Sequence, residues 1–125
     1  PKDLPALMGA EKLQKKAAKA GFDWDDIAPV WQKLAEETAE LQEAAAQGDD
    51  AHTAEELGDV LFSVVNLARF LRVEPEFALR QANGKFQQRF CYVEQCVADS
   101  GKSWKDFTLE ELDSFWNAAK KQQEL

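Results

Sequence analysis

Apolar residues recur every three or four positions along most of this chain, which is the spacing of one face of an α-helix. No segment of useful length alternates apolar and polar residues with a period of two, so the pattern predicts no strand. We expect helices over residues 4–20, 27–47, 51–71 and 75–99, and a last helix from residue 108 onward. Because the connections are short, consecutive helices are expected to be antiparallel neighbours. The sequence therefore predicts an all-α protein, an antiparallel bundle of about five helices.

Residues that begin or end helices support these boundaries. Gly21 follows the first helix as a C-terminal cap, and Gly48 begins the turn after the second. Pro29 must lie in the first turn of its helix, and Pro75 suits the first position of the fourth. Residues 108–111, Thr-Leu-Glu-Glu, form the signature of a capping box at the start of the last helix.

The apolar stripes predict which side of each helix is buried. The first helix is expected to turn Leu7, Leu13 and Ala17 inward. The stripe of the second helix comprises Ile27, Val30, Trp31, Leu34, Thr38 and Leu41. The stripe of the third helix comprises Leu57, Leu61, Val64, Ala68 and Leu71. Packing these stripes together would form the core of the bundle.

Length, charge and cysteine content narrow the class of protein. A chain of 125 residues fits one domain, 1–125. The net charge of −8 argues against binding duplex nucleic acid, whose phosphates need clustered Lys and Arg. Cys91 and Cys96 point in divergent directions on a helix, so we expect two free thiols and a reducing cytoplasm. No apolar run is long enough to span a membrane, and the N-terminus has no signal-peptide pattern.

Two acidic pairs on consecutive helices are the most informative motif. Glu37 and Glu40 are three residues apart, as are Glu56 and Asp59, and positions i and i+3 share a helix face. A short connection would place the two pairs side by side, so that four carboxylates converge. Mg²⁺ prefers oxygen ligands of this kind. The pattern therefore predicts a magnesium site that holds a phosphate.

Solvent-exposed helix faces are the competing interpretation of these charges. Most glutamate-rich helices carry such faces without a metal, and the single His52 is more typical of a cap or surface position than of a ligand. The third helix, however, offers no Lys or Arg between Glu56 and Arg69 to neutralise its acids. Basic residues occur on later helices, where each taken alone could simply cover the rim of the core: Lys85, Arg89 and Lys120. Trp116 could be a core residue or could stack on a nucleobase.

The ordered set of motifs resembles the all-α nucleoside triphosphate pyrophosphohydrolases of the MazG superfamily, over nearly the whole chain. The central motif is Glu36-Glu37-x-x-Glu40 followed by Glu56-x-x-Asp59. The other matching segments are Leu4-Pro5-Ala6-Leu7, Lys12-Leu13-Gln14-Lys15, Gly21-Phe22-Asp23-Trp24, Gly58-Asp59-Val60-Leu61-Phe62, Asn66-Leu67-Ala68-Arg69 and Ala82-Asn83-x-Lys85-Phe86-x-x-Arg89-Phe90. More narrowly, the chain is similar to the C-terminal, catalytic module of the two-module bacterial members. Because its first residue, Pro1, is not methionine, the sequence is compatible with a C-terminal part cut from a longer two-module chain.

The resemblance implies hydrolysis of nucleoside triphosphates between the α and β phosphates, with broad base specificity and a housekeeping role in the nucleotide pool. It implies dependence on Mg²⁺, with Mn²⁺ as a substitute, and a homodimer or higher oligomer in which helices of neighbouring subunits pack together. The implied metal ligands are Glu37, Glu40, Glu56 and Asp59. The implied catalytic residues are Glu36, Glu37, Lys85 and Arg89. The implied substrate-binding residues are Asn83, Lys85, Arg89, Trp116 and Lys120.

Three alternatives remain open at the level of the sequence. A narrow-specificity relative, such as a dUTPase or a phosphoribosyl-ATP pyrophosphohydrolase, would act on one nucleotide. A non-catalytic module would bind nucleotide or only dimerise, although the complete set of acidic and basic residues speaks against it. A helical scaffold for a protein partner would gain no stability from Mg²⁺.

Overall fold

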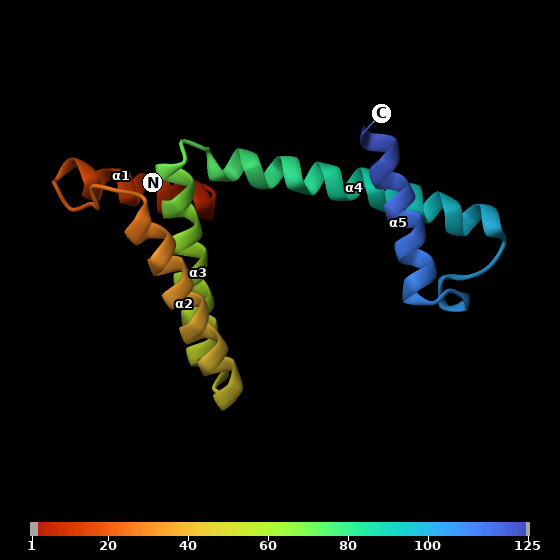
Figure 1. Cartoon of the computed structure of the whole chain (residues 1–125), viewed down its shortest axis with the longest axis horizontal. Coiled ribbons are helices and arrows are strands. Elements are labelled where there is room, and N and C mark those ends of the chain that lie inside the picture. Colours follow the sequence, from red (N-terminus) through yellow and green to blue (C-terminus); the bar gives the residue numbers. More distant parts are fainter. Residues whose placement is uncertain (1–2, 125) are drawn as a thin grey trace. The chain divides into compact units, whose positions relative to one another are not determined.

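A computed structural model describes residues 3–124 of the chain. Its helices are α1 (Ala6–Lys19), α2 (Ala28–Gln47), α3 (Asp50–Phe70), α4 (Pro75–Ser100) and α5 (Leu109–Glu124) (Figure 1). A short 3-10 helix, η1 (Trp104–Asp106), precedes α5. No strand occurs among the described residues. The predictions of an all-α fold and of five helices are therefore confirmed.

The helix ends follow the local chemistry expected of them. Pro29 lies in the first turn of α2, and Gly48 ends that helix in the left-handed conformation, with a φ of 74°. The Asp49 side chain then caps α3 by accepting a hydrogen bond of 3.1 Å from the His52 backbone N–H. At α5 the predicted capping box is present. The Glu111 N–H donates to Thr108 Oγ1, and the Thr108 N–H donates to Glu111 Oε1.

The chain divides into two compact units after Ala78. In the first unit, α2 and α3 form an antiparallel hairpin, and only Gly48 and Asp49 separate them (Figure 1). Helix α1 packs against α3. In the second unit α5 packs on α4, where the Phe86 and Trp116 rings lie 5.0 Å apart between centroids. Association of all five helices in one bundle stays a prediction.

The buried seam of the α2–α3 hairpin contains polar residues. The three buried residues of α2 are Val30, Glu37 and Ala44, each seven positions after the last, so they share one face. Two of the three buried residues of α3 are the apolar Val65 and Leu67, and the third is Ser63. Glu37 thus lies in the middle of the seam, where an apolar side chain would normally pack.

The prediction of which α3 face is buried was wrong for this chain taken alone. Leu57, Leu61, Val64 and Leu71 of the predicted stripe are exposed, Leu61 to 51%. Leu13 of α1 is likewise 64% exposed. The reason is that α3 has two apolar faces, and the one that carries Leu67 is buried within the first unit. Helical periodicity identifies both faces but does not say which of them an element of the same chain will cover.

None of the helices within residues 3–124 combines the length and the apolar content that a membrane crossing requires. Both cysteines are free thiols, and Cys91 is exposed.

Candidate metal centre

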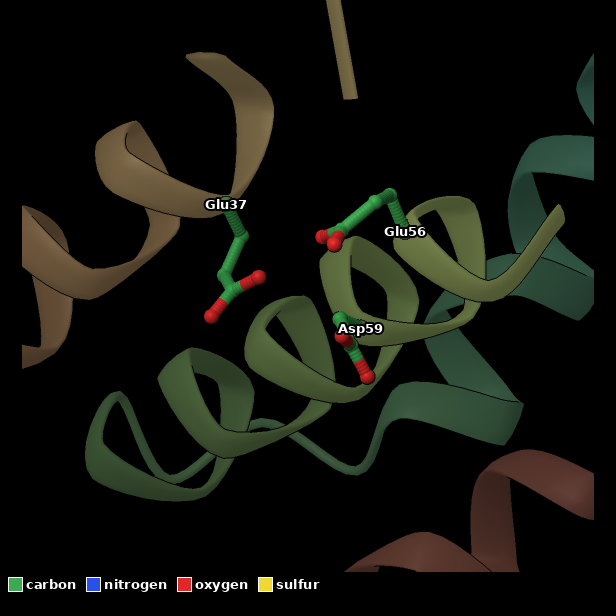
Figure 2. A group of neighbouring side chains, drawn as sticks. All are labelled: Glu37, Glu56 and Asp59. Carbon is green, nitrogen blue, oxygen red and sulfur yellow. The ribbon is translucent and has the colours of Figure 1, made fainter. Parts of the chain in front are cut away.

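Three of the four predicted metal ligands come together across the α2–α3 hairpin. Glu37 on α2 faces Glu56 on α3, and Asp59 lies one turn along α3 from Glu56 (Figure 2). One carboxylate oxygen from each lies within 4.8 Å of the other two. The hairpin produces this arrangement because its short turn aligns the two helices and each acidic pair keeps to one helix face. We call Glu37, Glu40, Glu56 and Asp59 the acidic cluster.

The burial of the acidic cluster makes its charge costly. Glu37 is only 7% exposed, and the side chain of Glu56 is 13% exposed. Glu37 Oε2 and Glu56 Oε2 are both buried without a hydrogen-bond partner among the described residues. A buried carboxylate oxygen with no partner destabilises the fold unless a proton or a cation reaches it. These oxygens fit a hard divalent ion, for which carboxylates are preferred ligands.

The other carboxylates of the acidic cluster shift the pKa of Glu40. The negative charge of Glu37 raises the pKa of the Glu40 carboxyl, and desolvation and the charge of Glu56 raise it further. This shift is the expected result of placing like charges close together. The structure thus brings three predicted ligands into one group and places the fourth within electrostatic reach of it.

Two contacts to the acidic cluster were not predicted from the sequence. Lys33 Nζ lies 2.9 Å from Glu37 Oε1, and this hydrogen-bonded carboxylate raises the pKa of Lys33. His52 Nε2 lies 3.0 Å from Glu56 Oε1. Each basic residue precedes its glutamate by four positions, and this i,i+4 spacing was the signal that could have identified both. The expectation that His52 is only a cap or surface residue missed its ring contact.

Glu36 has a different environment from the acidic cluster. Its side chain is 66% exposed, and its Oε2 lies 4.0 Å from Lys33 Nζ. The carboxylate therefore remains accessible to water on the α2 side of the cluster.

The predicted phosphate-binding and base-binding residues lie in the second unit. The Arg89 guanidinium stands 5.7 Å from the centre of the Trp116 ring, and its Nε donates to Gln123 Oε1 at 2.6 Å. Trp116 also contacts Phe86, so it is part of an aromatic cluster between α4 and α5. Asn83, Lys85 and Lys120 are exposed on the same two helices. The structure brings Arg89 and Trp116 together and leaves the roles of all five residues as predictions.

Known proteins resemble this chain over nearly its whole length. It is 45% identical over 125 residues to the nucleoside triphosphate pyrophosphohydrolase of Escherichia coli (strain K12), covering 98% of this chain and 48% of that protein. It is 44% identical over 117 residues to the nucleoside triphosphate pyrophosphohydrolase/pyrophosphatase MazG of Thermotoga maritima, covering 94% and 45%. It is 46% identical over 121 residues to protein YabN of Bacillus subtilis, covering 96% and 25%.

This chain spans less than half the length of each of these relatives. The profile of the MazG nucleotide pyrophosphohydrolase domain matches residues 27–93, which is more than half of the chain and includes the whole acidic cluster. The chain therefore belongs to the MazG nucleotide pyrophosphohydrolase family.

Proposed function

We propose that this protein hydrolyses nucleoside triphosphates between the α and β phosphates, releasing a nucleoside monophosphate and pyrophosphate, with broad base specificity. Family membership supports the reaction class, and two of the relatives carry the name nucleoside triphosphate pyrophosphohydrolase. The single observation that carries the proposal is the acidic cluster, with its two buried oxygens that lack a partner within residues 3–124.

The proposed cofactor is Mg²⁺, with Mn²⁺ as a substitute. Glu37, Glu40, Glu56 and Asp59 would hold it, because they supply hard oxygen atoms at one place. When bound, the ion supplies charge neutralisation on the phosphates and a lowered pKa for a bound water. Lys33 already neutralises part of the charge of Glu37, which would help the cluster to persist before the ion arrives.

The remaining roles are assigned to residues outside the acidic cluster. The attacking water would lose its proton to a carboxylate as its oxygen bonds to the α phosphorus and the bond to the pyrophosphate oxygen breaks. Glu36 suits this role better than Glu37, because its carboxylate is exposed whereas Glu37 is buried within the cluster. Lys85 and Arg89, with Asn83, would bind phosphate oxygens. Trp116 and Lys120 would contact the base or the phosphate tail.

Product identity tests the proposal. Purified protein is incubated with Mg²⁺ and a panel of ribo- and deoxyribonucleoside triphosphates, and pyrophosphate is resolved from orthophosphate. Pyrophosphate and monophosphate from several bases are expected. The Glu43→Gln variant, altered at an exposed carboxylate of α2, should retain this activity. Pyrophosphate from one nucleotide alone would indicate a narrow-specificity dUTPase or phosphoribosyl-ATP type of enzyme. No turnover would favour a non-catalytic nucleotide-binding or dimerisation module.

We also propose a homodimer or higher homo-oligomer. The exposed apolar face of α3, defined by Leu57, Leu61 and Val64, supports this, because a face of this kind is costly to leave in water. Leu61→Asp should lower the molar mass measured by light scattering after size exclusion, whereas Gln42→Asp, at an exposed polar position of α2, should not. A wild-type protein that stays monomeric at high concentration would contradict this proposal.

The compartment proposed for the protein is the cytoplasm. The support is chemical: Cys91 and Cys96 are free thiols, as is usual for proteins kept in reducing surroundings.

A further inference from the structure

Lys33 and His52 each contact one oxygen of a buried glutamate in the acidic cluster, and the two contacts have the same form. Lys33 Nζ lies 2.9 Å from Glu37 Oε1, and His52 Nε2 lies 3.0 Å from Glu56 Oε1. In both glutamates the other oxygen, Oε2, is buried and has no hydrogen-bond partner within residues 3–124. Each glutamate therefore has one oxygen engaged by a basic side chain and one left for another ligand.

Stabilisation of the helices is a poor explanation for these two contacts. On an isolated helix, an ion pair of i,i+4 spacing is more favourable when the acid precedes the base, as Glu11 precedes Lys15 in α1. In α2 and α3 the order is reversed, since Lys33 and His52 each precede their glutamate. What both contacts do achieve is to engage one oxygen of a carboxyl group that is almost completely enclosed by the protein.

The two contacts restrain the carboxyl groups. A carboxylate can only accept hydrogen bonds, so Lys33 and His52 must donate to the oxygens that they contact. In Figure 2 the carboxyl group of Glu56 points across the hairpin toward that of Glu37. Binding a metal ion through Oε1 would compete with the donor that Oε1 already has, whereas Oε2 has no protein partner to lose. Each glutamate is thus prepared to bind an ion through one oxygen.

The number of oxygens that each glutamate presents bears on which ion fits. Mg²⁺ requires a near-ideal octahedral arrangement, and the two closely spaced oxygens of one carboxylate fit that geometry poorly. Ca²⁺ takes roughly six to eight oxygen ligands and often binds both oxygens of one carboxylate. A glutamate that presents a single oxygen therefore suits Mg²⁺ and denies Ca²⁺ a second oxygen.

We propose that Lys33 and His52 are positioning residues that make Glu37 and Glu56 one-oxygen ligands, and that they thereby select Mg²⁺ over Ca²⁺ at the acidic cluster. The inference rests on the proposed function and deepens it, because it assigns the choice of ion to residues that do not bind the ion. Ca²⁺ is the relevant competitor, since it has the same charge and the same preference for carboxylate oxygens. Mn²⁺, which shares octahedral oxygen coordination with Mg²⁺, should remain a substitute.

The relative affinity of the protein for the two ions measures this selection. Melting curves in increasing MgCl₂ or CaCl₂, without nucleotide, give a dissociation constant for each ion, since an ion that binds only the folded state stabilises it by mass action. The quantity compared between proteins is the ratio of the two constants. Because both ions are divalent, removing a charged side chain changes both affinities similarly and largely cancels in this ratio.

Two pairs of variants separate the donor from the rest of the side chain. Lys33→Met and His52→Leu remove the N–H donor, whereas Lys33→Arg and His52→Gln keep one. Loss of a group that orients a metal ligand typically costs about 10- to 100-fold in metal affinity, so we expect Lys33→Met and His52→Leu each to reduce the preference for Mg²⁺ about tenfold. The Arg and Gln variants should keep most of it. Lys15→Met, which breaks the ion pair of α1, is the control and should match the wild type.

Several results would overturn the inference. An unchanged ratio in both Lys33→Met and His52→Leu would make the two contacts ordinary ion pairs, even if the melting temperatures fall. Equal loss of preference in the variants that keep a donor and in those that lack one would show that donation is not what selects the ion. A wild type that binds Ca²⁺ at least as tightly as Mg²⁺ would have no selection to explain. If one variant fails to fold, the pair at the other glutamate decides.

The outcome is separable from that of the proposed hydrolysis, because no nucleotide is present. Ion selection that depends on Lys33 and His52, in a protein that releases no pyrophosphate, would support the inference while the proposed reaction fails. An active protein whose preference for Mg²⁺ is the same without either donor would do the reverse. A wild type that neither ion stabilises would overturn the inference.

Discussion

Asp23 and Glu40 are carboxylates of the same α1–α3 unit, yet their surroundings shift their pKa values in opposite directions. Asp23 accepts two hydrogen bonds from Arg69, and chiefly for that reason its pKa is lowered. The pKa of Glu40 is raised, chiefly by the charge of Glu37. The chain thus supplies the cation that compensates Asp23. In the acidic cluster the carboxylates mainly face one another, and Lys33 and His52 offset only part of their charge.

The difference distinguishes a carboxylate that the chain itself neutralises from carboxylates whose charge it neutralises only in part. A group that pairs with Arg69 stabilises the fold whenever both are charged. A group of acids that repel one another costs stability unless a proton or a cation from outside neutralises part of their charge.

Removing the charge of one proposed metal ligand in the acidic cluster should lower turnover more than any other change. Loss of a group that only orients a metal ligand typically costs 10- to 100-fold in activity, so we expect Glu56→Gln or Asp59→Asn to lower kcat by more than about 100-fold. Circular dichroism should be unchanged, because both replacements keep the side-chain shape. Collapse of the helical signal in these variants would instead make the carboxylates structural.

Breaking the Asp23–Arg69 pair should affect stability. Asp23→Asn keeps the shape of the side chain but removes its charge and part of its hydrogen bonding. We expect a loss of about 1 kcal/mol of unfolding free energy, or about 4 °C in melting temperature, for this partly buried pair. Asp25→Asn, an exposed acid in the same loop, serves as the control. Equal melting temperatures for the two variants would remove the structural role of Asp23.

Removing the charge of Glu40 from the acidic cluster should stabilise the folded protein. In metal-free buffer at pH 7, Glu40→Gln removes a charge that Glu37 and Glu56 repel, so we expect a small rise in melting temperature. A fall in melting temperature would mean that Glu40 is compensated in a way that its contacts do not explain.

The contributions of Glu40 and Asp23 to folding stability should change in opposite directions as the pH falls. Because the pKa of Glu40 is raised, the folded protein takes up this proton at a higher pH than the unfolded chain. Its repulsion should therefore be relieved as pH falls from 7 toward 4.5, the ordinary value for glutamate. The stability that Asp23 contributes is present above 3.8, its ordinary value, and is lost as pH falls below it. Melting curves of wild-type protein minus those of Glu40→Gln isolate the first effect, and the difference should shrink on acidification above pH 4.5.

The sequence predicted what depends on neighbouring residues. Gly48, Pro29 and the Thr108/Glu111 capping box act through the backbone of their own helix, so their positions could be read directly. The acidic cluster could also be anticipated, because a two-residue connection leaves α2 and α3 no arrangement other than side by side.

Features that depend on contacts distant in the sequence could not be read in this way. The hydrogen bonds that tie α1 and the loop after it to α3 join Gln14 to Phe62 and Arg69 to Asp23, pairs separated by 48 and 46 positions. The exposure of Leu61 could not be anticipated for a related reason. A stripe of apolar residues has the same pattern whether its partner is another helix of the chain or a second subunit.

Mg²⁺-dependent melting of three proteins tests whether the acidic cluster binds a metal ion. The wild type, Asp23→Asn and Glu40→Gln are unfolded with and without Mg²⁺, since an ion that binds only the folded state raises its stability by mass action. We predict the same rise for the wild type and Asp23→Asn, whose acidic cluster is intact, and little or none for Glu40→Gln. An equal rise in all three would remove Glu40 from the metal site, and no rise in the wild type would contradict the proposal that the acidic cluster binds a metal ion.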